Sequence, residues 1–477
     1  MRSTIPSKSL FCIALLLCLL SCSTREAKEQ SDSLPSIFPD YVGITVPTCI
    51  APLNFMVEGA THMKAVFRHS NGSSLSVEGK DHIDIPLKKW HELAKEKGEL
   101  QVEVECWSKQ NPDGIRYKPF QIFLSEDGID SWVAYRHIPP GYEAWHDMGI
   151  YQRNLTNFEV EPLVENSQNN GGCVNCHAFL HADPNNFMFH ARGKGSGTIV
   201  CRNGQMEKVD IKKIGGKHGS YNYWHPSGRF IAFSSNNTHQ SFYGRSRDKI
   251  EVYDLGSDLI IYDTEKHEVL ADERFQDSIS WETFPTFSPD GKWIYFSSAQ
   301  AVQMPQQTEK LQYSILRAPF SEEGAIGEVD TVYNALERGG SVILPRISPD
   351  GRYMLYTWAQ SGAFHMYHKE ADLQMMDLQT GELVDTKPLN SPDVESHHVW
   401  STNGKWVLFA SKRVDTRYTR VFLAHWDGQR FGKPFLLPQK DPRQNTLFLF
   451  SYNIPEFISA PVRVSRERMA GFFRVKE

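Results

Sequence analysis

The stretch FSPDGKWIYFS at residues 287–297 decides the fold, because the chain repeats it. Related stretches are WHPSGRFIAFS at residues 224–234, ISPDGRYMLYT at residues 347–357 and WSTNGKWVLFA at residues 400–410. Each copy has a glycine where a tight turn needs positive φ, followed by an apolar run suited to a strand covered on both faces. Four-stranded sheets repeated around an axis are the blades of a propeller. We therefore predict an all-β chain with a β-propeller over residues 196–477.

The spacing of the repeats sets the number of blades. The turn glycines Gly228, Gly291, Gly351 and Gly404 are separated by 63, 60 and 53 positions. Further strands complete these units at residues 259–262, 313–318, 373–376 and 421–425. Residues 189–215 and 440–465 supply the remaining strands, some of them shared to close the ring. Six blades are predicted, with five or seven, or a sandwich of repeated hairpins, as alternatives.

Residues 37–150 are predicted to form a β-sandwich-like domain. The alternation Leu100, Val102, Val104, Cys106 places one face of a strand in the core. A short helix interrupts the strands between Pro86 and Gly98, and Leu87, Trp90, Leu93 and Ala94 fall on one of its faces.

The N-terminus is typical of an exported lipoprotein. Residues 1–22 combine Arg2 and Lys8, an apolar run too short to span a bilayer, and a small residue before Cys22. We predict that Cys22 carries the lipid and that residues 23–36 form a polar, poorly ordered tether. The protein is then held at the outer membrane of the cell envelope, on its periplasmic or its surface face.

Charge and composition narrow the partners. The formal net charge is −6 and no basic block occurs, which disfavours nucleic acid. Membrane contact is predicted through the lipid anchor alone. The remaining partners are an envelope protein or a redox partner.

Residues 151–195 read as a linker that carries one chemical motif, CVNCH at residues 173–177. This is the C-x-x-C-H pattern of c-type haem attachment. Two thiols at this spacing reach the two vinyl groups of one haem, and the adjacent histidine ligates the iron. The motif predicts one haem c bound by Cys173 and Cys176, with His177 as the proximal iron ligand.

The same cysteines admit other interpretations. They could form a local disulfide, act as a redox-active dithiol, or bind zinc with His177 and a further ligand. Cys49 and Cys106 could pair, and Cys201 is left over. Spacing alone does not choose among these.

The sixth position of the iron has several candidates. His181, Met188 and His190 follow the motif within thirteen residues. His190 is the first choice for the distal ligand, against an ordinary histidine of a propeller strand or an open position. Asp393, Glu395, His397 and His398 could line the mouth of the propeller, but solvated loop residues are the favoured interpretation.

Several stretches carry a resemblance: GIYQRNLTNFE, CVNCH followed by HARG, ETFPTFSPDGKWIYFSSA and SYNIPEF. The repeats resemble the WD40-like (PD40) repeats of TolB-type propellers. The whole mature chain is similar to a Bacteroidetes family of TolB-like propeller lipoproteins with one c-type haem motif, which are often labelled cytochrome c biosynthesis proteins. The resemblance implies export, a propeller and a haem at Cys173, Cys176 and His177. It implies no defined reaction.

Three functions follow from these expectations. The leading one is electron transfer or haem-linked redox chemistry by an envelope lipoprotein. The alternative is a non-enzymatic propeller that binds a protein or a glycan, with a structural cysteine pair. A third is an enzyme that uses the haem or the propeller mouth, with His397 and His398 contributing; no catalytic residue is assigned.

Overall fold

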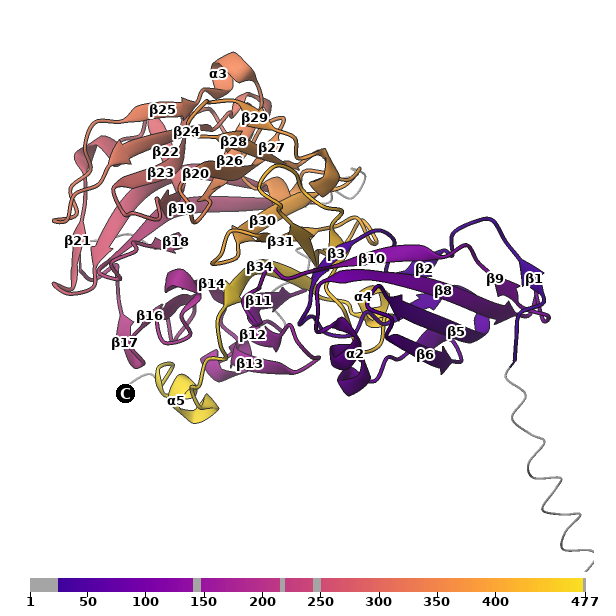
Figure 1. Cartoon of the computed structure of the whole chain (residues 1–477). Coiled ribbons are helices and arrows are strands. Elements are labelled where there is room, and N and C mark those ends of the chain that lie inside the picture. Colours follow the sequence, from indigo (N-terminus) through magenta and orange to yellow (C-terminus); the bar gives the residue numbers. More distant parts are fainter. Residues whose placement is uncertain (1–24, 140–146, 215–218, 243–249, 475–477) are drawn as a thin grey trace, which may run out of the picture.

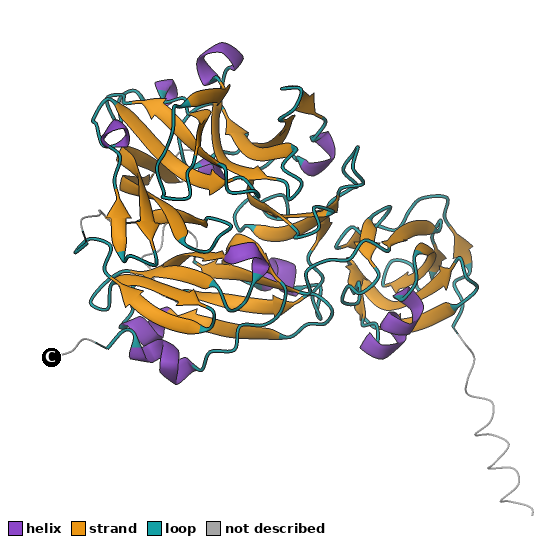
Figure 2. Ribbon diagram, turned by 60° about the vertical axis from the view of Figure 1, so that its left-hand side comes forward, coloured by secondary structure: helices purple, strands orange, loops and turns teal. Residues whose placement is uncertain are grey.

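The computed structural model describes residues 25–139, 147–214, 219–242 and 250–474, which form two β-rich domains (Figure 1). Figure 2 shows a smaller domain beside a larger ring of sheets, both built mainly from strands. This confirms the all-β prediction. The predicted signal peptide and its lipid-attachment residue Cys22 lie outside the described residues. Within the described ranges, no helix is long and apolar enough to cross a membrane.

Two sheets form the N-terminal domain. The larger sheet has seven strands: β1 (Glu29–Gln30), β3 (Thr45–Pro47), β5 (Ala60–His69), β6 (Ser74–Gly79), β8 (Gly98–Ser108), β9 (Ile115–Arg116) and β10 (Phe120–Ser125). The smaller sheet has three: β2 (Ile37–Phe38), β4 (Phe55–Val57) and β7 (His82–Ile83). The single described helix of this domain is α2 (Leu87–Ala94).

The core of this domain follows the sequence pattern closely. Leu100, Val102, Val104 and Cys106 are all buried on β8, as predicted from their alternation. On α2, Trp90 is fully buried and its Nε1 donates a hydrogen bond to the Ile50 carbonyl at 2.9 Å. Leu87 is 40% exposed, so its predicted place on the buried face is wrong. Leu87 is the first residue of the helix and directly follows Pro86.

The segment expected to be a loose tether is paired with the domain over its described part. Strand β1 runs parallel to β9, with Glu29 opposite Ile115 and Gln30 opposite Arg116. The backbone N–H of Ser31 also bonds to the Arg116 carbonyl at 2.9 Å. A polar composition predicted disorder here, but an unpaired sheet edge supplied hydrogen-bond partners.

Six four-stranded sheets form the propeller. From the axis outward, the strands of the first blade are β14 (Val174–Phe179), β15 (Phe187–Ala191), β16 (Gly197–Arg202) and β17 (Gln205–Val209). Those of the second blade are β18 (Ser220–Trp224), β19 (Phe230–Phe242), β20 (Ile250–Asp263) and β21 (Glu268–Leu270). Those of the third blade are β22 (Ser280–Phe287), β23 (Trp293–Gln300), β24 (Ser314–Pro319) and β25 (Asp330–Tyr333). The fourth blade consists of β26 (Ser341–Ile347), β27 (Tyr353–Ala359), β28 (Asp372–Asp377) and β29 (Leu383–Val384). The fifth blade consists of β30 (Glu395–Trp400), β31 (Trp406–Ser411), β32 (Arg420–His425) and β33 (Phe435–Leu436). The sixth blade consists of β34 (Ser451–Ile458), β11 (Trp132–Ile138), β12 (Gly149–Asn154) and β13 (Val160–Glu165). Short helices α3 (Ala335–Arg338) and α4 (Gln444–Leu447) lie in connections between strands, and α5 (Arg466–Gly471) follows the last strand, β34.

The sixth blade closes the ring. Strand β34, close to the C-terminus, pairs antiparallel with β11, about 320 positions earlier in the chain (Figure 1). Each innermost strand contacts the next, and β34 contacts both β30 and β14. The number of blades is therefore six, as predicted. The predicted domain boundaries change: β11, assigned to the sandwich, and residues 151–195, assigned to a linker, belong to the propeller. Periodicity could not reveal this because the blade combines both ends of the propeller chain.

The two domains share a packed interface. Blade-five residues Trp406 and Leu408 belong to the same apolar cluster as the sandwich core. His425 Nε2 lies 2.7 Å from Asp127 Oδ2, and Trp406 Nε1 donates to the Gly128 carbonyl at 3.0 Å. The sandwich therefore rests against the fifth blade.

The repeated turns have the predicted geometry. Gly228, Gly291, Gly351 and Gly404 have φ values of 72°, 72°, 75° and 67°. Each turn connects the innermost strand of a blade to the second strand. A related turn at residues 180–186 serves the first blade, where the Leu180 N–H bonds to the Asn186 carbonyl at 2.9 Å. It escaped detection because it contains no glycine.

Every innermost strand contains one non-glycine residue in the left-handed region, beside a break in register with the second strand. These residues, with φ between 46° and 56°, are Cys176, Tyr221, Phe284, Leu344, His397 and Ile454. Such a bulge bends a strand and redirects the side chains near it. Because all six strands share it, the bulges form one layer around the axis.

Candidate functional site

The C-x-x-C-H motif lies in this layer. Cys173 directly precedes β14, and Cys176 and His177 are on it. Cys176 is the left-handed residue of the first blade, with φ of 50°. The expectation that the motif lies in a linker is therefore wrong, since four of its five residues are on the innermost strand of a blade.

His177 is a buried histidine without a hydrogen-bond partner. Its side chain is 2% exposed, and neither ring nitrogen makes a hydrogen bond. Burial, helped by the nearby charge of Arg136, lowers the pKa of His177 to about 3, while a weak interaction with the Ile454 backbone opposes the shift. The imidazole is therefore neutral at neutral pH, which is the form that ligates metals.

The nearest carboxyl group does not form an ion pair with this histidine. Glu456 Oε2 lies 3.9 Å from His177 Nε2. Burial raises the pKa of Glu456 to about 8, although Arg346 opposes the shift. Both groups are mostly uncharged at pH 7, so little electrostatic attraction holds them together.

The two cysteines of the motif are buried free thiols. Burial raises the pKa of Cys173, outweighing the opposing charges of Arg136 and Arg192. A raised pKa disfavours the thiolate that a redox-active dithiol needs. Cys49, Cys106 and Cys201 are also free, so neither a Cys173–Cys176 nor a Cys49–Cys106 disulfide is present.

Zinc lacks ligands in the described part of the chain. No group of three or more histidine, cysteine, aspartate or glutamate side chains there is arranged to hold a metal ion. His177 still presents a single neutral donor beside two thiols, which is the set that a covalently attached haem requires from the protein.

His190, the predicted distal ligand, lies one strand further out on β15. Its Nδ1 is 2.7 Å from Thr198 Oγ1, and its ring centroid lies 5.4 Å from that of Phe233. One of these contacts is thus with the neighbouring strand β16 of the same blade and the other is with β19 of the second blade. Its role as a ligand stays a prediction.

The group before the fourth repeat is buried, contrary to the solvated loop favoured from the sequence. Asp393, Glu395, His397 and His398 are all buried, and the last three lie on β30, an innermost strand. Burial lowers the pKa of His397 to about 3, helped by the charge of Arg136.

Unsatisfied polar atoms are concentrated on the innermost strands. Buried side-chain atoms without a hydrogen-bond partner occur there on Asn175, His177, Asn222, Glu282, Thr286, Ser396, His397, Asn453 and Glu456. Natural proteins leave few such atoms without a protein, water or ligand partner. The axis near the motif is therefore suited to holding a polar ligand or ordered water.

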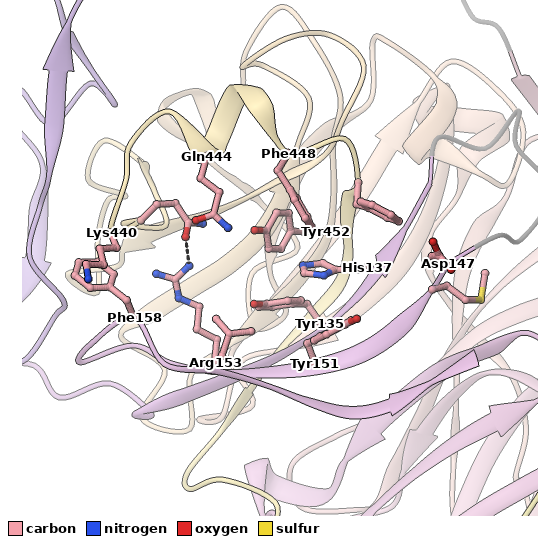
Figure 3. Close-up of a pocket in the computed structure, with 14 residues that line it drawn as sticks. Tyr135, His137, Asp147, Tyr151, Arg153, Phe158, Lys440, Gln444, Phe448 and Tyr452 are labelled. Carbon is pink, nitrogen blue, oxygen red and sulfur yellow. Dashed lines mark hydrogen bonds between the residues drawn. The ribbon is translucent and has the colours of Figure 1, made fainter. Parts of the chain in front are cut away.

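A separate pocket of about 400 Å³ opens on the sixth blade beneath the segment 439–450 (Figure 3). His137 lies among the rings of Tyr135, Tyr151, Phe448 and Tyr452, with centroids 4.5–4.9 Å away. Burial lowers the pKa of His137 to about 3, and its Nε2 has no hydrogen-bond partner.

The polar end of this pocket is formed by Arg153, which is fully buried. Its Nη1 donates to Gln439 Oε1 at 2.8 Å, the contact drawn in Figure 3, and its Nη2 donates to the Pro438 carbonyl. Aromatic faces with a few polar groups at one end are typical of small-ligand sites.

Sequence reasoning missed this pocket and the axial residues Arg136, Arg346 and Glu456. Only one signal was available: GIYQRNLTNFE and SYNIPEF, both quoted for the family resemblance, contribute to the sixth blade. Nothing in the sequence indicated that these distant stretches belong to one sheet, in which β11 lies between them.

Taken together, the sheet order defines an all-β protein with a sandwich domain and a six-bladed propeller closed by its last strand. No protein-family model matches the chain, and no curated protein matches it in sequence. Among solved structures it is similar to TolB from Acinetobacter baumannii, at 14% identity and a TM-score of 0.44, over 78% of this chain and 85% of that one.

Two further solved structures are similar. The β-propeller domain of the Trilobed protease from Pyrococcus furiosus has 14% identity and a TM-score of 0.36, over 64% of this chain and 82% of that one. A puromycin hydrolase has 13% identity and a TM-score of 0.37, over 66% and 54%. These TM-scores are low, so the propeller assignment rests on the sheet topology.

Proposed function

We propose that this protein is a lipoprotein of the outer membrane, anchored through Cys22, whose propeller carries one haem c and transfers electrons in the cell envelope. The observation that carries the proposal is His177, a neutral buried imidazole with two unpartnered nitrogens next to two free thiols at C-x-x-C-H spacing. The predicted signal peptide agrees with the proposal, because covalent attachment of haem takes place outside the cytoplasm.

The residues present fit the attachment chemistry. Each thiol of Cys173 and Cys176 would add across one vinyl group, so that sulfur bonds to one carbon and hydrogen goes to the other. His177 would provide the proximal nitrogen. A bound haem would supply a one-electron ferric/ferrous couple. Because the motif is buried on β14, we expect attachment to precede closure of the first blade.

A haem-stained denaturing gel and a pyridine haemochrome spectrum test the proposal. The protein is exported from a host with a c-type maturation system, alongside a Cys173→Ala/Cys176→Ala variant. We expect a stained band that the double variant loses. Cys201→Ala is the matched control, since Cys201 is a buried free thiol outside the motif. An unstained wild-type band, from cells that mature a control cytochrome, would refute the haem.

The anchor is tested separately by fractionation and labelled palmitate. We expect the wild type in the membrane fraction with label, and Cys22→Ser in the soluble fraction without it. Labelling of Cys22→Ser would contradict lipidation at this residue.

A second candidate function is recognition of a protein or glycan without haem, and the aromatic pocket favours it. Probing a glycan array with the Cys173→Ala/Cys176→Ala chain tests this function. We expect Tyr151→Ala to weaken any signal, since Tyr151 lines the pocket. Binding that is indifferent to this substitution would place recognition elsewhere.

A further inference from the structure

Arg136 differs from the other buried arginines. It is 6% exposed and makes no hydrogen bond or ion pair with any described residue. Its Nε is buried without a partner, as is that of Arg153, but Arg136 has no hydrogen bond from its other nitrogens either. By contrast, Arg153 donates to Gln439 and Pro438, and Arg420 donates to the carbonyls of Asn445 and Phe448 at 2.7 Å. A guanidinium stays charged in proteins, so Arg136 holds an unpaired positive charge.

Arg136 is on β11, the second strand of the sixth blade, where it lies opposite Asn453 of the innermost strand β34, and its charge acts on groups of the innermost strands. This charge partly offsets the burial that raises the pKa values of Cys173 and Tyr367, and it adds to the burial that lowers the pKa values of His177 and His397. These four groups lie on three different parts of the ring. None of these groups is an anion at neutral pH. The one carboxyl group beside His177 belongs to Glu456, and the arginine that acts on it is Arg346.

An unpaired charge in a buried site is strongly unfavourable, and a single guanidinium matches a single carboxylate in geometry and charge. We propose that Arg136 binds the carboxylate of a ligand at the propeller axis. If the proposed function holds, on which this part of the inference rests, the carboxylate is a propionate of the haem attached to Cys173 and Cys176. Otherwise it belongs to a free carboxylic acid.

The sign of a stability change distinguishes these cases. In the haem-free Cys173→Ala/Cys176→Ala chain, Arg136→Met removes an unpaired charge and is expected to raise the midpoint of thermal unfolding by about 2 °C or more. In the haem-loaded chain the same substitution removes the partner of a propionate, and the midpoint is expected to fall. Arg136→Lys keeps the positive charge but loses the planar guanidinium that can donate two parallel hydrogen bonds. Its unfolding midpoint is expected to lie between those of the Arg136 and Arg136→Met chains. Arg317→Gln is the control, since Arg317 is already paired with Asp330 at 3.0 Å.

A second experiment compares the midpoint of thermal unfolding of the haem-free chain in sodium acetate with that in sodium chloride at equal ionic strength. We expect acetate to raise the midpoint with Arg136 present and to have no such effect on Arg136→Met. Reversal of sign in the haem-loaded chain identifies a propionate, whereas the acetate effect alone identifies a free carboxylate. If haem staining is negative, the proposed function fails, and the comparison of acetate with chloride alone tests whether Arg136 binds a carboxylate. Equal destabilisation by Arg136→Met in every form, with no acetate effect, would overturn the inference.

Discussion

The first and fifth blades place a histidine at the same backbone position with opposite results. In each innermost strand the left-handed residue, Cys176 or His397, is followed by a histidine, His177 or His398. His398 Nε2 donates to the Leu355 carbonyl at 3.0 Å, and Thr357 Oγ1 lies 3.5 Å from its Nδ1. Neither nitrogen of His177 has a partner. A position shared by the fold thus holds a structural histidine in one blade and an available ligand in the other.

The largest expected difference concerns haem. We expect His177→Leu to lower haem staining per folded molecule on the order of 10-fold or more, because it removes the proximal ligand. His398→Leu, the matched control, is expected to keep its haem. The measurement is the haemochrome absorbance per mole of purified protein. Equal losses in both variants would end the functional distinction between the two blades.

Stability in the haem-free chain is expected to show the reverse order. His398→Leu leaves the buried Leu355 carbonyl without its donor and should cost about 2–3 kcal/mol of unfolding free energy. His177→Leu removes only unpartnered nitrogens, so its cost should stay within about 1 kcal/mol. Urea unfolding of both variants in the Cys173→Ala/Cys176→Ala background measures this. A larger loss for His177→Leu would show that this histidine is structural.

Acid sensitivity should be shared by the two histidines. Burial lowers the pKa of both to about 3, whereas an unfolded histidine titrates near its ordinary pKa of 6.5. As the pH falls from 6.5 toward 3, the unfolded chain takes up a proton that the folded chain does not. The folded state therefore loses up to about 1.4 kcal/mol per pH unit for each histidine. Urea unfolding at pH 7, 6 and 5 should give a shallower slope for His177→Leu and for His398→Leu. Slopes identical to that of the parent chain would contradict neutral burial.

The smallest expected effect sharpens the account of His398. Its contact with Thr357 is long at 3.5 Å, so Thr357→Val should cost no more than about 1 kcal/mol. Thermal unfolding of Thr357→Val and of His398→Leu measures how much of the stabilisation by His398 comes from Thr357 and how much from the Leu355 carbonyl. A loss as large as that of His398→Leu would make Thr357 the main partner.

Much of the fold was predictable from local patterns. Turn glycines such as Gly291 and the alternation along β8 both act over a few residues, so their structural effect can be recognised without knowing the fold. The first-blade turn at 180–186 was missed because another sequence forms the same hydrogen-bonded turn without glycine. Six blades were predicted, with strands from residues 440–465 closing the ring. That β11, β12 and β13 complete the sixth blade was missed, because its strands come from opposite ends of the propeller.

The sequence by itself determined the repeat, the class of fold and the spacing of Cys173, Cys176 and His177, because each depends on residues close together in the chain. Only the tertiary structure decided which histidine is satisfied and which charge is left without a partner. His398 meets Leu355 from 43 positions away, and Arg136 reaches the axis through a blade completed by β34. Hydrogen bonds and burial between distant segments are set when the ring closes, and no local pattern of residues encodes them.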